Sequence, residues 1–263
     1  MSNKKSYKKS DEPSNAPSNT KQASFRRRAL IGGCAAIAVA FAAGVGIATG
    51  TGTGTSSAEE ADRPLKVPAN SSGADGTLIA YGDSKAGTTI KVYEDLRCPY
   101  CGEFERKLGP TLKDMVDSGK VRVEFHLAAF LDKSLGGQGS KTSLAALGAA
   151  LNESPDKFRS FHSVLFANQP AKETDDDFGS TANLLELADR VPGLRTPSFN
   201  KAVKEKTYAP WADKVADVFY DSDVTGTPTV KADGKKLTVI GENGKAVSPK
   251  DFTRQVDAAV AAE

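Results

Sequence analysis

The pattern of apolar and polar positions predicts a strand, a helix and a second strand in the middle of the chain. Residues 88–94 alternate between apolar and polar side chains, as in a strand with one buried face. Residues 98–118 repeat apolar side chains at helical spacing, and residues 121–127 return to alternation. The helical stripe consists of Phe104, Leu108, Leu112 and Met115. These three segments predict one βαβ unit.

The next part of the chain is predicted to be helical. Apolar residues recur there at helical spacing, and Ala and Leu, which favour helices, are frequent. Helices are expected at 140–152, 155–168, 181–190, 197–206 and 208–220. They would form a helical insertion over about residues 138–222.

Strand patterns return after this insertion. Apolar runs at 224–230 and 236–240 flank Asp233-Gly234, a pair typical of a tight hairpin turn. A last amphipathic helix follows, and a short strand is expected at 78–81. This order predicts an α/β domain over residues 77–263, with a central mixed sheet and inserted helices.

Charge is distributed unevenly along the chain. The whole sequence of 263 residues has a net charge of +2. Residues 1–28 hold eight Lys or Arg and two Asp or Glu side chains, so the remainder is net acidic. An acidic body argues against nucleic acid as a partner. Because residues 1–28 contain hardly an apolar group, we predict a disordered, basic cytoplasmic tail.

Residues 29–49 form an uncharged segment. As a helix they would span about 31 Å, close to the hydrocarbon thickness of a bilayer. The preceding basic residues would keep the N-terminus in the cytoplasm. The segment is rich in Ala and Gly, which also suits a cleavable signal peptide. We favour a retained single-pass anchor over secretion after cleavage. A flexible linker at 50–76 would then lead to a domain outside the cytoplasm.

Two cysteines stand at the junction between the first strand and the helix. Cys98 is expected at the helix N-terminus, and Cys101 one turn inside it. The free N–H groups and dipole of a helix start stabilise a thiolate, so the pKa of Cys98 should fall below about 8.5. Pro99 suits the first turn because it lacks an N–H group. Cys101 could close a disulfide and expel a bound partner, which makes the pair a dithiol redox site.

The sequence gives less support to other functions for the cysteines. A structural zinc site needs four ligands, and only Cys34, His126 and His162 could supply the others. Cys34 lies within the apolar segment at 29–49. A purely structural disulfide across so short a loop would stabilise the fold little. We therefore expect no metal and no organic cofactor.

The domain resembles the thioredoxin superfamily, and specifically its bacterial DsbA-like branch. The matching features are Cys98-Pro99-Tyr100-Cys101 after a strand, the helical insertion, and Gly226-Thr227-Pro228-Thr229 before the late hairpin. The resemblance covers about residues 77–263. It implies a thioredoxin-like fold and thiol–disulfide oxidoreductase activity.

The resemblance also implies roles for individual residues. Pro228 would follow a cis peptide bond and face the cysteines, and Thr227 would pair with an extended substrate. Strong oxidants of this branch have His at the position of Tyr100, so the resemblance does not fix the redox potential of the Cys98–Cys101 pair. Many relatives carry a buried acid where this chain has Val92. Glu94 and Asp95 are the nearest acids, and either could relay protons to Cys101 or belong to a solvated strand end.

The two histidines lack a catalytic partner motif. His126 falls on the polar side of its strand, and His162 lies in an apolar helix. We therefore expect surface or packing roles for both.

We hypothesise an extracytoplasmic thiol–disulfide oxidoreductase. Cys98 would form mixed disulfides with exported proteins that contain cysteines, and Cys101 would release them. A membrane redox partner, which the sequence does not identify, would reset the pair. The alternative is a non-enzymatic, surface-anchored module that binds a peptide or a metal.

Overall fold

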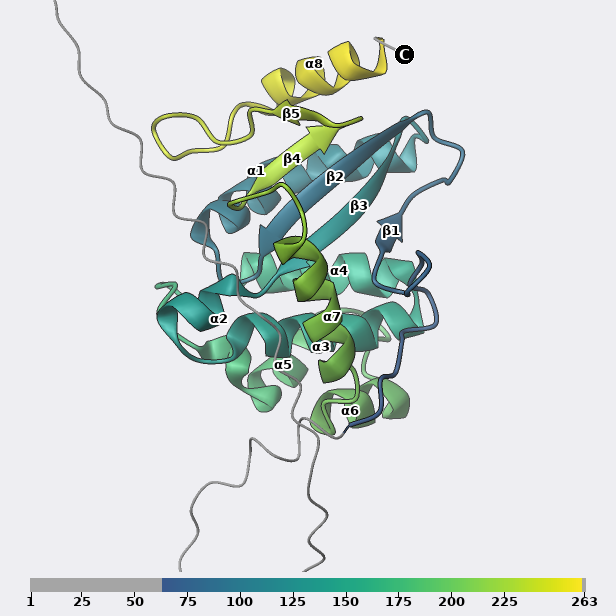
Figure 1. Ribbon diagram of the computed structural model, residues 1–263, viewed down its shortest axis with the longest axis vertical. Coiled ribbons are helices and arrows are strands. Elements are labelled where there is room, and N and C mark those ends of the chain that lie inside the picture. The colour runs from purple at the N-terminus through teal and green to yellow at the C-terminus, as the bar shows by residue number, and fades with distance from the viewer. Residues whose placement is uncertain (1–62, 262–263) are drawn as a thin grey trace, which may run out of the picture. The chain divides into compact units, whose positions relative to one another are not determined.

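The computed structural model describes residues 63–261 (Figure 1). The proposed cytoplasmic tail, the segment at 29–49 and the first part of the linker lie outside these residues. Within residues 63–261, no helix is both long and apolar enough to cross a membrane.

The domain is built on a five-stranded mixed sheet in the order β1-β3-β2-β4-β5. β2 (Thr88–Asp95) and β3 (Val121–Ala128) are parallel and are joined by α1 (Pro99–Asp117). β1 (Ile79–Tyr81) is antiparallel to β3. β4 (Thr229–Ala232) is antiparallel to both β2 and β5 (Lys235–Leu237). The predicted βαβ unit and mixed sheet are therefore confirmed.

The core follows the predicted alternation. The odd-numbered residues of β3 from Val121 to Leu127 are at most 1% exposed. α1 buries its apolar stripe and packs against α8 (Pro249–Val260), where the Phe104 and Phe252 rings meet edge to face at 6.2 Å. In Figure 1, α8 lies beside β5, and the helices between β3 and β4 gather at the other end of the domain.

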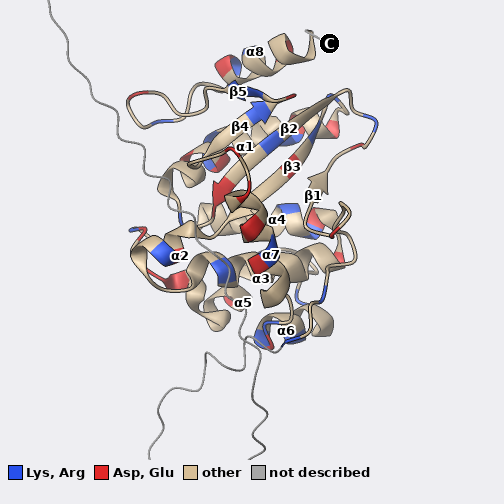
Figure 2. Ribbon diagram, in the orientation of Figure 1, with Lys and Arg blue, Asp and Glu red and all other residues tan. Residues whose placement is uncertain are grey.

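The insertion contains one short helix that the sequence pattern missed. α2 (Phe130–Leu135) has six residues, too few for a periodic signal. The predicted helices are confirmed with ends shifted by a few residues. They are α3 (Gly139–Glu153), α4 (Pro155–Ala167), α5 (Thr181–Ala188), α6 (Pro197–Lys204) and α7 (Ala209–Tyr220). A 3-10 turn, η1 (Asp177–Gly179), precedes α5. Acidic and basic residues are interspersed along these elements (Figure 2).

Local sequence explains where several helices begin. Side-chain oxygens of Ser154, Ser180, Thr196 and Ser248 each accept a hydrogen bond from a backbone N–H of the first turn. Such N-caps satisfy donors that have no partner within the helix.

The late hairpin is confirmed but shorter than predicted. Asp233 (φ +44°) and Gly234 (φ +82°) form its turn, as a two-residue hairpin turn with left-handed central residues requires. β5 ends at Leu237, and beyond it Ile240 forms only an isolated bridge to Ala246.

The last residues of the expected linker pack against the insertion. The Ala69 N–H donates to Asn152 Oδ1 at 3.1 Å, and the Asn70 amide donates to the Leu151 carbonyl at 2.8 Å. Trp211 Nε1 donates to the Gly76 carbonyl at 2.8 Å. This segment therefore contributes to the domain before residue 77.

Gly148 allows α3 and α7 to approach closely. A Cβ at this position would lie 2.7 Å from Trp211 Cζ3, and Trp211 is fully buried. We predict that Gly148→Val lowers the free energy of unfolding by about 2 kcal/mol or more, because the core has no room for the side chain. Urea denaturation checks this. Lys141→Ala, on the same helix, removes only an exposed ion pair with Asp213 and should cost less than about 1 kcal/mol. Equal midpoints for the two variants would contradict the prediction.

Candidate active site

Cys98 stands where β2 passes into α1. It is the N-cap of α1, and its carbonyl accepts the Gly102 N–H at 3.1 Å. Pro99 occupies the first helical position, and the Cys98 N–H donates to the Asp95 carbonyl at 2.9 Å. The predicted placement of both cysteines is confirmed.

The two sulfurs differ in their access to solvent. Both cysteines are free thiols. Cys98 is 6% exposed and Cys101 is 0% exposed, whereas the intervening Tyr100 is 51% exposed. An incoming thiol can therefore reach Cys98 and is kept from Cys101.

A segment distant in sequence, which contains Thr227 and Pro228, lies against Cys98. Its Sγ lies 3.6 Å from the carbonyl oxygen of Thr227, 129 residues further along the chain. The Thr227–Pro228 peptide bond is cis, as the resemblance implies. The fold thus brings together the cysteine pair and the Thr-Pro dipeptide.

The surroundings drive the pKa values of the two thiols apart. The pKa of Cys98 is lowered to about 7, first by a hydrogen bond from the Cys101 thiol. The Thr227 hydroxyl and the backbone N–H groups of Cys101 and Tyr100 add to this effect, while burial opposes it. Burial raises the pKa of Cys101 well above its usual value. The helix start contributes as the sequence predicts, but Cys101 is the larger cause.

A groove runs beside the cysteine pair. The loop that follows β5 lines it together with Tyr100 and Pro228. The loop is held by a hydrogen bond from the Ala246 N–H to Glu103 Oε1 at 3.3 Å. The groove is lined by Tyr100, Thr227, Pro228, Ile240, Gly241, Glu242, Asn243 and Gly244. Neither cysteine lines the groove, but Tyr100 lies between them in sequence and the Thr227 carbonyl contacts Cys98 Sγ.

Gln169, just beyond α4, fixes the backbone on either side of the active-site turn. Its amide donates to the carbonyls of Leu96 at 2.8 Å and Cys98 at 2.9 Å. Its own oxygen accepts from Arg106 at 3.2 Å. A Cβ at position 102 would lie 1.8 Å from that oxygen, which explains Gly102 directly after the second cysteine.

Glu94 and Asp95 do not form a solvated strand end, because both are fully buried. Asp95 acts as a structural hub. Its carboxylate accepts hydrogen bonds from the Ser140 hydroxyl at 2.6 Å, the Arg97 N–H at 2.9 Å and the Leu131 N–H at 3.2 Å. These bonds tie the end of β2 to α2 and α3.

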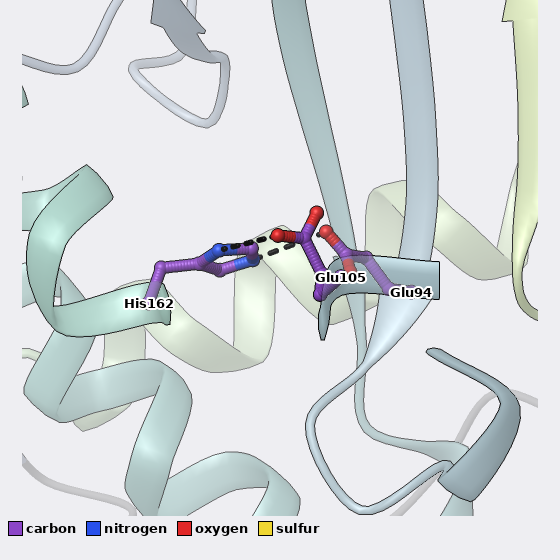
Figure 3. A group of neighbouring side chains, drawn as sticks. All are labelled: Glu94, Glu105 and His162. Carbon is purple, nitrogen blue, oxygen red and sulfur yellow. Dashed lines mark hydrogen bonds and ion pairs between the residues drawn. The ribbon is translucent and has the colours of Figure 1, made fainter. Parts of the chain in front are cut away.

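Glu94 belongs to a buried ionisable cluster, which we define as Glu94, Glu105, Arg159 and His162. Figure 3 shows Glu94, Glu105 and His162 pointing toward one another. His162 Nε2 lies 3.1 Å from Glu94 Oε1, and His162 Nδ1 lies 3.0 Å from Arg159 Nη1. Arg159 Nη1 also donates to Glu105 Oε2 at 3.2 Å. All four side chains are at most 5% exposed as residues.

Burial dominates the charge states within this cluster. It raises the pKa of Glu94 to about 8, an effect that the Arg159 charge partly offsets. It lowers the pKa of His162 to about 3. Both groups are therefore neutral at pH 7. The charge of Glu94, where present, also raises the pKa of Cys98's neighbour Cys101.

The cluster has donor atoms that suit a cation, since Glu94, Glu105 and His162 each offer one atom within 4.8 Å of the others. However, the guanidinium of Arg159 already donates to Glu105 and contacts His162. The positive charge at this position is supplied by the chain itself, so we assign no metal to it.

Sequence reasoning missed most of these neighbours. Glu105 interrupts the apolar stripe of α1, and Arg159 and His162 interrupt that of α4. Charged residues inside an apolar stripe are the signal that could have found them. His126 has the packing role that the sequence predicts, since its ring stacks on Tyr93 at 4.4 Å.

Comparisons with known proteins agree with this geometry. A model of the family described as thioredoxin matches residues 74–258. Disulfide bond formation protein D of Bacillus subtilis is 26% identical over 157 residues, which cover 59% of this chain and 68% of that protein. The reduced disulfide bond oxidoreductase DsbG of Mycobacterium tuberculosis is 28% identical, with a TM-score of 0.56 over 71% of this chain and 93% of that one. The oxidised DsbA of the same organism is 27% identical, with a TM-score of 0.57 over 70% and 92% of the two chains.

The lowered pKa of Cys98 gives a testable pH dependence. Because the thiolate is the reactive form, alkylation of Cys98 should rise with pH through a midpoint near 7 and level off above it. Stopped-flow reaction with iodoacetamide measures this in a Cys34→Ser background, which removes the third thiol. Cys98→Ser is the control and should abolish the fast phase, because Cys101 is buried. A midpoint at the ordinary cysteine value would show that the site does not stabilise the thiolate.

Proposed function

This chain belongs to the thioredoxin family and is a DsbA-like thiol–disulfide oxidoreductase, and from this premise we propose that it introduces disulfides into exported proteins. The observation that carries the proposal is the asymmetry of the cysteine pair. Cys98 is the more accessible sulfur and has a pKa of about 7, while the pKa of Cys101 is raised. Cysteines that merely brace a binding module would not need this difference.

The oxidised pair would act in two steps. A substrate thiolate attacks Sγ of Cys98, the bond between Cys98 and Cys101 breaks, and Cys101 leaves as a thiolate that takes up a proton. A second substrate thiolate then attacks the substrate sulfur of the mixed disulfide and expels the Cys98 thiolate. The substrate loses two electrons and the pair gains them. The low pKa of Cys98 makes it a good leaving group, which favours transfer toward the substrate.

Glu94 would exchange the proton with Cys101. Its pKa of about 8 keeps the carboxyl protonated at neutral pH, so that it can protonate the departing thiolate. In the reverse step, the carboxylate would accept the proton as Cys101 attacks a mixed disulfide. Asp95 is less suited to this role, because its oxygens already accept three hydrogen bonds.

The groove would position the substrate chain. Thr227 would offer backbone groups for strand-like pairing beside Pro228, and this would bring the substrate cysteine to Cys98. Pro99 shapes the helix start, and the exposed Tyr100 forms one wall of the groove. Because a phenol replaces the imidazole of stronger oxidants, we expect Tyr100 to contact the substrate rather than to lower the pKa of Cys98 further.

The compartment is part of the proposal. The uncharged segment at 29–49 follows a basic tail, so it would anchor the chain in the cell membrane with the domain outside the cytoplasm. Secretion after cleavage is the alternative. In either case we expect a membrane redox partner to reoxidise the pair, because each transfer leaves Cys98 and Cys101 reduced.

Separate substitutions of the two cysteines test the reaction. In a Cys34→Ser background, Cys98→Ser should abolish oxidative refolding of a reduced, disulfide-containing protein, because the attacked sulfur is lost. Cys101→Ser should instead accumulate mixed disulfides, because nothing remains to release them. Non-reducing gels and refolding assays measure both. Unchanged thiol exchange by Cys98→Ser would sink the proposal.

The proton role of Glu94 predicts a particular pH profile. The rate at which Cys101 releases a preformed mixed disulfide should rise with pH through about 8, as Glu94 becomes a base. Glu94→Gln should lose this inflection and slow release by about 10-fold or more. Rapid quenching at each pH measures the rate. Glu186→Gln, at an exposed position of α5, is the control and should behave as the parent chain. An inflection that survives in Glu94→Gln would assign the base to another group.

A further inference from the structure

We propose that His162 is a positioning residue, which binds one oxygen of Glu94 and so makes the other oxygen, Oε2, the atom that carries the proton for Cys101. The inference rests on the proposed proton exchange between Glu94 and Cys101. It assigns a role to a side chain that touches neither the substrate nor the cysteines in the reaction.

Arg159 fixes which nitrogen of His162 bears the hydrogen. A guanidinium only donates hydrogen bonds and does not give up its proton in proteins. Arg159 Nη1 lies 3.0 Å from His162 Nδ1, so Nδ1 must be the unprotonated acceptor. The neutral ring then carries its hydrogen on Nε2. Since Nε2 lies 3.1 Å from Glu94 Oε1, His162 donates to that oxygen.

This hydrogen bond decides where Glu94 holds its proton. Because the unprotonated oxygen of a neutral carboxyl is the better acceptor, the hydrogen bond from Nε2 makes Oε1 the carbonyl oxygen and places the proton on Oε2. Oε2 is buried and has no hydrogen-bond partner among the described residues. Oε2 is therefore the oxygen left free to exchange a proton, and Glu94 interacts electrostatically with both cysteines.

Packing prevents His162 from turning away. Its ring is 4.8 Å from that of Phe166 and 4.9 Å from that of Phe125, and the residue is fully buried. Arg159 is held in turn by Glu105 at 3.2 Å and by the Gly109 carbonyl at 3.3 Å. The Nε2–H group of His162 is therefore already in place to donate to Glu94, and the side chain need not reorient as a mobile or solvated donor would.

The charged and titratable groups around Glu94 come from both adjoining helices. Cys98, Cys101 and Glu105 belong to α1 or its N-cap, and Arg159 and His162 belong to α4. Arg159 and Glu105 balance each other in charge. When Oε2 gives its proton to Cys101, the new charge on Glu94 is stabilised by the Nε2 hydrogen of His162 and by the charge of Arg159. The proton does not pass through His162, because Arg159 beyond it cannot exchange one.

Two substitutions separate positioning from simple packing. In His162→Gln the side-chain amide can still donate to Glu94 and accept from Arg159, whereas His162→Leu can do neither. Using the full chain with Cys34→Ser, we expect His162→Leu to slow release of a preformed mixed disulfide about 10-fold at pH 7 and to move the pH midpoint upward. We expect His162→Gln to retain most of the parent rate and midpoint.

A double substitution and a histidine control complete the test. In a Glu94→Gln background, His162→Leu should cause no further loss, because the group that it positions is gone. His126→Gln should leave the pH midpoint unchanged, since His126 stacks on Tyr93 away from the cluster. The inference is wrong if His162→Leu keeps the parent profile, if His162→Gln is as impaired as His162→Leu, or if the losses with Glu94→Gln add.

The tautomer can be measured without any substitution in the cluster. Long-range nitrogen–proton NMR correlation on the full chain should show His162 neutral at pH 7 with its hydrogen on Nε2. A hydrogen on Nδ1, or an imidazolium, would overturn the inference even if the variants failed to fold. A failure of the proposed function looks different, because the parent chain would then transfer no disulfide at any pH.

Discussion

The chemistry of the active site depends on the unequal burial of two sulfurs that lie one helical turn apart. Cys98 keeps contact with solvent and with hydrogen-bond donors, while Cys101 is enclosed by α1 and the core. Burial penalises a charge and hydrogen bonds stabilise it, so the two pKa values move in opposite directions. In the proposed reaction, this difference makes Cys98 the sulfur that the substrate attacks and the leaving group of the second step. It also makes a nearby proton donor necessary for Cys101, because its thiolate is costly in the interior.

The helical insertion supplies side chains that support the active-site turn, which the βαβ unit alone does not contain. Arg159 and His162 contribute to the buried cluster from α4, and Gln169 holds the carbonyls of the active-site turn. On the other side, the buried Arg97 donates to Asp132 at 2.9 Å and to the carbonyls of Gly136 and Glu173. The turn that carries Cys98 is therefore clamped from two directions. Such support holds the active-site turn and the start of α1 in place.

The buried cluster is stable because it is nearly neutral and well packed. An isolated charge in this interior would be costly, and Arg159 paired with Glu105 avoids that cost. Glu94 and His162 stay uncharged at pH 7, so the cluster as a whole carries little net charge. A carboxyl that titrates near neutral pH is useful for proton transfer, and burial is the main cause of the raised pKa of Glu94.

The sequence by itself determined the local elements and the redox pair. Alternation predicted β2 and β3, helical periodicity predicted the helices of the insertion, and the Cys98–Cys101 spacing at a strand–helix junction indicated dithiol chemistry. These are short-range properties, in which each residue acts on neighbours a few positions away. Only the tertiary structure decided that Glu94 is buried rather than solvated, that Asp95 is a structural hub, and that His162 binds Glu94 across 68 positions of the chain. Burial and charge balance depend on which distant segments pack together. The apolar periodicity of one segment does not show which other segments will pack against it.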